Sequence, residues 1–269
     1  MRFLTACGIL AASFLACHFA SAQSIPPPEN PYKELGGESA GIKGPAGPSK
    51  PAPRGADGKP DLSGFWKGPL IFGGMFKSAG GPPFTPAGEE AYKYNLAKSI
   101  NPEALCLFAG IPRASISGVP FEIVQNLNRV VFLYELMWTF RTIPLDGRGH
   151  AKDFEPSFFG DGIGKWDGDT LVIDSIGFKD KLSWIDDDAH PHSDAMHVVE
   201  RWSRPDTDHL AHEVTVEDPK FYTKPWVAAD KLIFHLLPAD FDMGEMICSP
   251  QEMEEYKKQV ANPVTEGGK

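Results

Sequence analysis

The fold of this chain is constrained most by a succession of short runs rich in β-branched and aromatic residues, with turn sequences between them. Asp167-Gly168-Asp169 separates two such runs, and Pro205-Asp206-Thr207-Asp208 separates another two. An Asp-Gly pair in that position is a strong local signal for a β-hairpin. We expect strands at residues 60–66, 120–125, 129–143, 164–166, 170–176, 196–203, 209–216, 231–237 and 246–248.

This spacing predicts a mainly β domain of many short antiparallel strands. The expected fold is an antiparallel β-barrel of lipocalin-like or calycin-like form, or a sandwich, with a few peripheral helices. Long polar loops between the hairpins favour the barrel, with the ligand site at its mouth. One helix is expected from Thr85-Pro86, an N-cap and N1 pair, to Lys98. Another is expected from the capping box at Ser249 to Val260.

Alternation along a strand indicates which side chains share a face, because successive residues point to opposite sides. If residues 129–143 form one strand, its faces carry Phe132, Tyr134, Trp138 and Phe140, and Glu135, Thr139 and Arg141. Along residues 196–203 the faces carry His197, Val199 and Arg201, and Val198, Glu200 and Trp202. Aromatic side chains suit an apolar or aromatic ligand, although core packing is the alternative use for them. The predicted ligand-binding residues are Tyr134, Trp138, Phe140 and Trp202.

The first 22 residues have the pattern of a secretory signal peptide. Arg2 supplies the positive start, residues 3–19 are mostly apolar, and Ala20-Ser21-Ala22 is a cleavage site. The expected location is therefore periplasmic or secreted, and a lipoprotein anchored at Cys17 is the less favoured alternative. Residues 23–60, rich in proline and glycine, predict an extended or disordered tail. A single domain is expected at residues 61–260, before a disordered C-terminus at 261–269.

Cleavage would leave two cysteines, Cys106 and Cys248, which predict one disulfide in an oxidising compartment. Two buried free thiols are the alternative. The chain has a formal net charge of −10, and removal of a segment whose only charge is Arg2 makes the remainder more negative. This charge argues against nucleic acid and anionic lipid as partners. After the signal, the sequence has no apolar stretch long enough to span a membrane.

Five motifs in the expected domain are C-L-F-A-G-I-P-R (106–113), D-G-R-G-H (146–150), G-K-W-D-G-D-T-L-V-I-D (164–174), P-H-S-D-A-M-H-V-V-E-R (191–201) and E-D-P-K-F-Y-T-K-P-W (217–226). As a set they resemble a largely uncharacterised family of secreted bacterial proteins. The chain departs from that family at Phe108, where the family has a proline, and at Asp167, where it has a glutamate. The resemblance covers most of residues 61–248. It implies one domain and brings no reaction with it.

The densest group of chemically versatile residues contains three of the eight histidines, His190, His192 and His197, with acidic residues around them. Histidine titrates near neutral pH and is the commonest metal ligand. As acid–base catalysts, His192 or His197 would move a proton and Asp194 would orient the imidazole. The alternative metal ligands are His190, His192, His197 and Glu200. Pro191 disturbs the strand that would place His190 and His192 on one face, and His197 and Glu200, three residues apart, point to opposite faces of a strand. No cofactor is therefore favoured, and a divalent transition metal is the alternative.

A second candidate group is Asp146-Gly147-Arg148-Gly149-His150. Asp-Gly indicates a turn, and Arg148 is a fixed cation whose forked donors suit carboxylates. His150 would act as an acid or base if its loop shared a cavity with His192 or His197. Arg148 or Arg201 would then stabilise developing negative charge.

Residues 61–260 contain no G-x-S-x-G elbow, phosphate loop, G-x-G-x-x-G or C-x-x-C motif, which argues against hydrolase, NTPase and nicotinamide chemistry, and the G-x-S-x-G match at residues 37–41 lies in the predicted tail. The leading hypothesis is a periplasmic or secreted enzyme that uses His/Asp/Arg acid–base chemistry on a small apolar or aromatic molecule, as a lyase or isomerase. The first alternative is a non-catalytic barrel that binds a hydrophobic ligand. The second is a metal-binding protein at the His190–Glu200 cluster.

Overall fold

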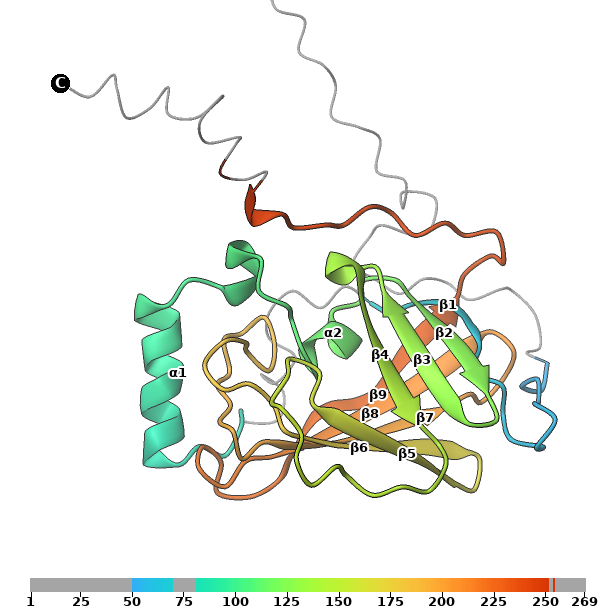
Figure 1. Cartoon of the computed structure of the whole chain (residues 1–269), viewed down its shortest axis with the longest axis horizontal. Helices are drawn as coiled ribbons and strands as arrows, with labels where there is room; N and C mark the ends of the chain where they lie inside the picture. Colours follow the sequence, from blue (N-terminus) through green and yellow to red (C-terminus); the bar gives the residue numbers. More distant parts are fainter. Residues whose placement is uncertain (1–49, 70–80, 252–253, 255–269) are drawn as a thin grey trace, which may run out of the picture.

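The computed structural model describes residues 50–69, 81–251 and 254. Within these residues, nine strands form one antiparallel sheet that curves into a nearly closed barrel (Figure 1). The strands are β1 (Gly64–Lys67), β2 (Phe121–Asn126), β3 (Arg129–Tyr134), β4 (Thr139–Pro144), β5 (Asp161–Asp167), β6 (Thr170–Ile176), β7 (His197–Ser203), β8 (His209–Glu217) and β9 (Trp226–Leu236). Their order across the sheet is β4-β3-β2-β1-β9-β8-β7-β6-β5. The predicted mainly β fold is therefore confirmed.

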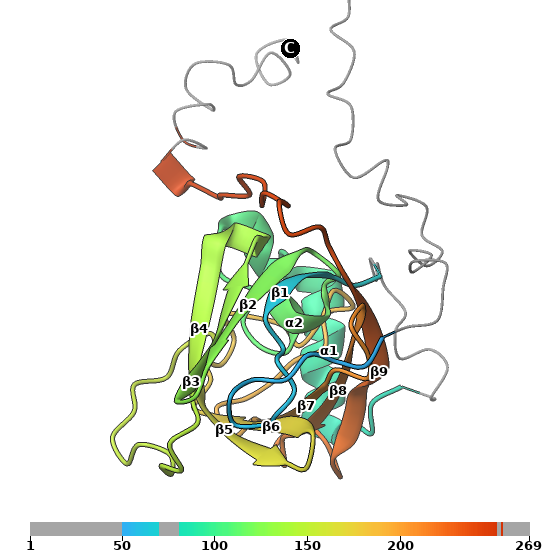
Figure 2. The same cartoon turned by 90° about the vertical axis from the view of Figure 1, so that its right-hand side faces the viewer.

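Four helical segments between β1 and β4 accompany the barrel, namely α1 (Pro86–Lys98), η2 (Pro102–Leu105), α2 (Arg113–Ile116) and η3 (Leu136–Trp138). Helix α1 begins as predicted, because the Thr85 hydroxyl oxygen accepts a hydrogen bond from the Gly88 N–H at 3.1 Å. It lies outside the barrel. Helix α2 lies within the ring of strands (Figure 2), and all four of its residues are buried. Its side chains therefore fill part of the barrel interior.

The two ends of the sheet, β4 and β5, meet along a seam that is held by side-chain packing. A Cβ atom added to Gly164 would lie 2.6 Å from the Leu145 side chain and 2.7 Å from that of Ile143. At Gly162 it would lie 2.8 Å from Ile143. The two glycines therefore leave the space that side chains of the opposite end occupy, and this close approach nearly closes the barrel.

The region 129–143 differs from the single strand that we expected. At η3 the backbone of Met137 and Trp138 has φ values of 56° and 49°, and the chain turns back on itself there. Residues before and after η3 form the paired strands β3 and β4, in which Phe132 lies opposite Arg141. The turn breaks the alternation, so Arg141 shares the interior face with Phe132, whereas Phe140 points outward and is 66% exposed.

The other hairpins follow the sequence signals. Residues of β5 and β6 pair on either side of Gly168, and β7 pairs with β8. On β7 the interior face carries Val198, Glu200 and Trp202, as predicted. Residues 246–248 form no strand, and the last helix begins at Pro250, although most of its expected length lies outside the described residues.

The predicted signal peptide (1–22), most of the tail and the C-terminus (261–269) also lie outside the described residues. The described end of the tail is placed against the β5–β6 turn. Arg54 forms a two-point ion pair with Asp169, and the Lys59 ammonium donates to the Gly168 carbonyl oxygen at 3.0 Å. The disulfide between Cys106 and Cys248 is present, as predicted. Among the described helices, none has the length and apolar character that a membrane crossing requires.

Candidate functional site

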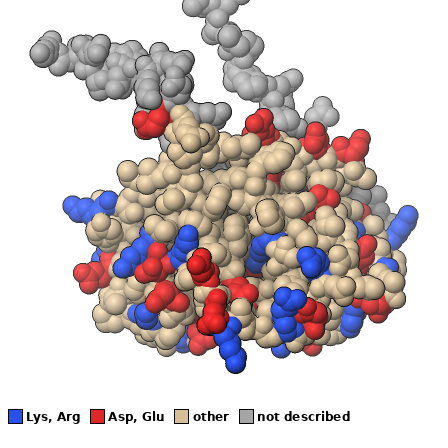
Figure 3. Space-filling view, viewed as in Figure 1, with Lys and Arg blue, Asp and Glu red and all other residues tan. Residues whose placement is uncertain are grey.

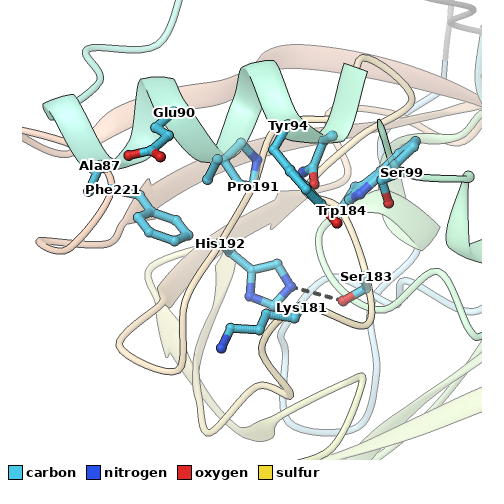
Figure 4. A pocket seen from close by; sticks show the side chains of 12 residues that line it. Ala87, Glu90, Tyr94, Ser99, Lys181, Ser183, Trp184, Pro191, His192 and Phe221 are labelled. Atoms are coloured by element: carbon cyan, nitrogen blue, oxygen red, sulfur yellow. Dashed lines mark hydrogen bonds between the residues drawn. The ribbon is translucent and has the colours of Figure 1, made fainter. Parts of the chain in front are cut away.

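A pocket of about 630 Å³ lies between α1 and the loops that follow β6 and β8 (Figure 4). Helix α1 contributes Ala87, Glu90, Ala91, Tyr94 and Asn95, and Ser99 follows it. The loops contribute Lys181, Ser183, Trp184, Pro191, His192 and Phe221. The lining therefore combines aromatic and apolar surface with a few polar groups, which is the usual composition of a small-molecule site.

His192 is the titratable group with the clearest catalytic geometry in this pocket. Its Nδ1 lies 3.2 Å from the Ser193 carbonyl oxygen, which can only accept, so Nδ1 carries the ring proton. Its Nε2 then presents a lone pair, and the Ser183 hydroxyl donates to it at 2.9 Å. Burial lowers the pKa of His192 below its ordinary value of 6.5, so the imidazole is neutral near neutral pH. His192 is therefore equipped to act as a base through Nε2.

The backbone around His192 is fixed on both sides. Asp218 is buried and accepts hydrogen bonds from the Ser193 N–H at 2.6 Å and the Ser193 hydroxyl at 2.8 Å. The Tyr222 hydroxyl donates to the Pro191 carbonyl oxygen at 2.6 Å. Because both neighbours are anchored, the imidazole has a defined direction, which positioned catalytic groups need.

His190 fastens the same loop to α1 instead of lining the pocket. Its Nδ1 lies 2.6 Å from Asp186, and its ring stacks on Tyr92 with centroids 4.9 Å apart. Nearby, the Asn95 amide donates to the Ala189 carbonyl oxygen at 3.0 Å. His190 thus has a structural role, because its contacts hold the loop against α1.

Two loop residues near the pocket have left-handed backbone conformations, Lys181 with φ 61° and Ala189 with φ 66°. Non-glycine residues rarely adopt such values, which cost of the order of 1–3 kcal/mol where the surroundings impose them. They lie two positions before Ser183 and three before His192. Met137 and Trp138 have the same conformation in the turn at η3, so these values mark tight turns of the loop beside the pocket.

Three other predicted catalytic residues point away from the pocket. Asp194 forms an exposed ion pair with Lys220, so it does not orient His192. The reason is local, because Ser193 turns inward to Asp218 and the following residue then faces solvent. On β7, Arg201 pairs with Asp167 at 3.0 Å on the outer face. Arg148 forms an exposed ion pair with Asp146 and borders a smaller cleft of about 400 Å³ at the seam.

The fold does bring two of the predicted histidines together. His150 Nδ1 lies 3.0 Å from Asp161, and its Nε2 lies 2.9 Å from Asp174. His197 Nε2 reaches the same oxygen of Asp174 at 3.1 Å. His150 and His197 therefore meet at one carboxylate, whereas His192 lines the separate pocket beside α1.

The contacts of His150 predict a pH-dependent contribution to stability. Burial lowers its pKa, but hydrogen bonds to Asp174 and Asp161 raise it more, so the pKa lies above 6.5. A raised pKa in the folded state stabilises the fold fully below the unfolded value, and this contribution is lost as the pH rises through the folded value. We expect the difference in unfolding free energy between the wild type and His150→Gln to be larger at about pH 5.5 than at about pH 8.5. Urea denaturation at both pH values would measure it, and a pH-independent difference would contradict the assignment.

A second polar cluster lies inside the barrel. Glu200 on β7 accepts two hydrogen bonds from the Arg141 guanidinium, at 2.6 Å and 2.8 Å. His212 Nε2 lies 3.1 Å from Glu200, and the Ser115 hydroxyl donates to the same carboxylate at 3.2 Å. The Tyr134 hydroxyl lies 3.2 Å from Ser115 Oγ. All five side chains belong to buried residues.

The charges of this interior cluster balance. Burial raises the pKa of Glu200, but Arg141 and His212 lower it more, to about 2. Burial lowers the pKa of Arg141, but Glu200 raises it more, so the guanidinium stays charged. Burial raises the pKa of Tyr134 to about 12 and lowers that of His212, which leaves both neutral. One cation thus faces one anion, and the cluster orders the barrel interior.

The predicted ligand-binding aromatic residues are spread over three environments, none of them the pocket lining. Tyr134 belongs to the interior cluster, and Trp202 is a core residue stacked on His212 with centroids 3.6 Å apart. Trp138 is 57% exposed and donates from its indole nitrogen to the Gly244 carbonyl oxygen. Phe140 faces outward because of the turn at η3. The pocket uses other aromatic residues, among them Tyr94, Trp184 and Phe221.

The four alternative metal ligands are not brought together. His190 is bonded to Asp186, His192 to Ser183, His197 to Asp174 and Glu200 to Arg141. No group of three or more His, Cys, Asp or Glu residues is arranged to hold a metal ion within the described ranges.

Several residues of these sites gave no signal in the sequence. Ser183 lies in no nucleophile motif, and Arg141, Ser115 and His212 are single residues of strands or of a four-residue helix. Comparison with known proteins finds no matching family model and no curated protein of significant similarity. The geometry of the pocket is therefore the basis of the proposed function.

Proposed function

We propose that this protein is an enzyme that acts on a small apolar or aromatic molecule, with His192 as its general base. One observation carries the proposal: the buried imidazole of His192 is neutral near neutral pH, and its Nε2 lone pair accepts a hydrogen bond from Ser183 in the pocket lining. An effective base at neutral pH must be unprotonated and within reach of the group that it deprotonates. The periplasmic or secreted location remains a prediction from residues 1–22.

The pocket lining supports a substrate that has both an apolar and a polar part. Tyr94, Trp184 and Phe221 offer aromatic surface, while Glu90 and Lys181 offer charges of opposite sign. The volume of about 630 Å³ falls within the usual range for small-molecule sites. Acidic and basic side chains are intermixed over the face in Figure 3, and no broad basic surface of the kind that nucleic acids require is seen on the described part of this face.

The experiment that tests this proposal compares the wild type with His192→Gln. A panel of aromatic and aliphatic carbonyl compounds and esters would be screened for binding by thermal shift and for conversion by mass spectrometry. We expect turnover in His192→Gln to fall by about 10²–10⁴-fold, the usual contribution of a general base, while binding is retained. Glutamine can still accept the Ser183 hydrogen bond, so the pocket should keep its shape.

His209→Gln is the matched control, because His209 pairs with Asp206 and does not line the pocket. This variant should keep wild-type turnover. Wild-type turnover in His192→Gln as well would overturn the proposal. Binding without conversion of any compound would instead support the second candidate, a non-catalytic carrier, which the aromatic lining favours. In that case Trp184→Ala should weaken binding and His192→Gln should not.

A further inference from the structure

We infer that Ser183 is a nucleophile that His192 activates, and that the pocket takes carboxylic esters with an apolar or aromatic substituent. This inference rests on the proposed function, because His192 is the base in both. It identifies the Ser183 hydroxyl as the group that His192 deprotonates, and carboxylic esters as the substrate class. The lyase and isomerase hypotheses then become the less favoured alternatives.

The direction of the His192 lone pair carries the inference. Nδ1 is committed to the Ser193 carbonyl oxygen, so Nε2 is the ring atom that can accept a proton. The Ser183 hydroxyl occupies that direction at 2.9 Å, within the distance expected of a nucleophile and its base. A lyase or isomerase would need Ser183 to leave this position before a substrate C–H could replace it. Ester chemistry uses the hydrogen bond as it stands.

The position of the pair in the pocket agrees with this role. Ser183 and His192 both line the cavity, where their dashed hydrogen bond lies in Figure 4. Phe178 packs edge-on against the imidazole with centroids 6.5 Å apart, which shields the ring on that side. The Ser193 carbonyl oxygen takes the place that a carboxylate occupies in a three-residue catalytic set, since it fixes the tautomer and the ring direction.

The proposed reaction has two steps. In acylation, Ser183 Oγ forms a bond to the ester carbonyl carbon and its proton passes to His192 Nε2. The bond from that carbon to the alcohol oxygen then breaks, and the departing oxygen takes the proton from Nε2. In deacylation, water attacks the acyl carbon while His192 Nε2 takes its proton. The bond from that carbon to Ser183 Oγ then breaks, Oγ takes the proton from Nε2, and the carboxylic acid leaves. Lys181 lines the pocket, but its side chain is 86% exposed and its ammonium lies 3.7 Å from Asp180, so it is given no role in these steps.

The G-x-S-x-G match at residues 37–41 lies outside the described residues, and Ser183 belongs to no such motif, which does not conflict with this assignment. That motif belongs to a strand-to-helix turn on a parallel sheet, whereas Ser183 lies in a loop of an antiparallel barrel. Pairs of serine and histidine are recognised by geometry and roles, and not by sequence position.

The test uses the full chain and a fluorophosphonate probe, which forms a stable bond to an activated serine as fluoride leaves. Intact mass should show uptake of one probe per chain, and peptide mapping should place it on Ser183. Ser183→Ala should take up none. Ser203→Ala, a serine that does not line the pocket, should react as the wild type. His192→Gln should react at least about 100-fold more slowly than the wild type. The size of the initial burst of product from p-nitrophenyl acetate should rank the variants in the same order as their labelling rates.

The labelling rate should also depend on pH. Since burial lowers the pKa of His192, the rate should reach half its maximum below pH 6.5. Absence of a Ser183 adduct on the wild type, together with turnover that needs His192 but not Ser183, would overturn this inference and leave the proposed function standing. Absence of both the adduct and any dependence on His192 would overturn both. The wild-type adduct is independent of whether a variant folds.

Discussion

Replacing Glu200 by Gln is expected to lower the free energy of unfolding by about 3–5 kcal/mol, since removal of one partner leaves the other charge buried and uncompensated. Arg141 is 5% exposed, and two hydrogen bonds from its guanidinium end on the Glu200 carboxylate. Urea denaturation followed by tryptophan fluorescence would measure the change, because the buried Trp202 lies on the same strand.

The matched control is the ion pair between Arg201 and Asp167, one residue further along β7 and on its outer face. Asp167 is 64% exposed, so Asp167→Asn should change the unfolding free energy by less than about 1 kcal/mol. The double variant Arg141→Met/Glu200→Leu should recover part of the loss, since no unpaired charge remains, while His212 and Ser115 lose the partner that Glu200 provided. Equal effects of Glu200→Gln and Asp167→Asn would show that the interior charge is solvated, contrary to this reasoning.

Removal of the disulfide should have the second largest effect on stability. Cys106 and Cys248 are 142 positions apart, so the bond restricts most of the unfolded chain. The chain-entropy argument gives an upper figure of about 5 kcal/mol for a loop of this size. The Cys106→Ser/Cys248→Ser variant should therefore unfold at a clearly lower urea concentration than the oxidised wild type. Reductant should lower the wild-type midpoint and leave that of the variant unchanged, and equal midpoints in oxidising buffer would contradict the prediction.

The strands were predictable where a local signal marked both ends. Asp-Gly at residues 167–168 placed the β5–β6 hairpin, and the threonine–proline pair at residues 85–86 placed the start of α1. The reversal at η3 contains neither glycine nor proline, so the sequence offered one long strand where two occur. That single missed turn exchanged the faces of Phe140 and Arg141.

The candidate site was predictable only in part. His192 could be found because it belongs to a local cluster of histidines, but its partner Ser183 lies in an unremarkable stretch nine positions earlier. Two of the partners of Glu200 lie 59 and 85 positions away, at Arg141 and Ser115. Contacts over such separations depend on closure of the barrel, which alternation within one strand does not describe. Asp194 was misplaced for the opposite reason, because a local turn at Ser193 decides its direction.

The barrel consists of two halves that are each continuous in sequence, since β1 to β4 lie on one side of the sheet and β5 to β9 on the other. The two halves pair along a short ladder between β1 and β9, in which Trp66 lies opposite Leu236 and Lys67 opposite His235. Their second junction is the seam between β4 and β5, at Gly162 and Gly164. Within each half the paired strands follow one another in the sequence, although α1, η2 and α2 separate β1 from β2 and residues 177–196 separate β6 from β7. The remaining pairs are local, which favours their rapid assembly. Arg141 belongs to the first half and Glu200 to the second, so their ion pair links the two halves across the barrel interior. We therefore expect loss of this ion pair to weaken the docking of one half against the other more than the pairing of strands within each half.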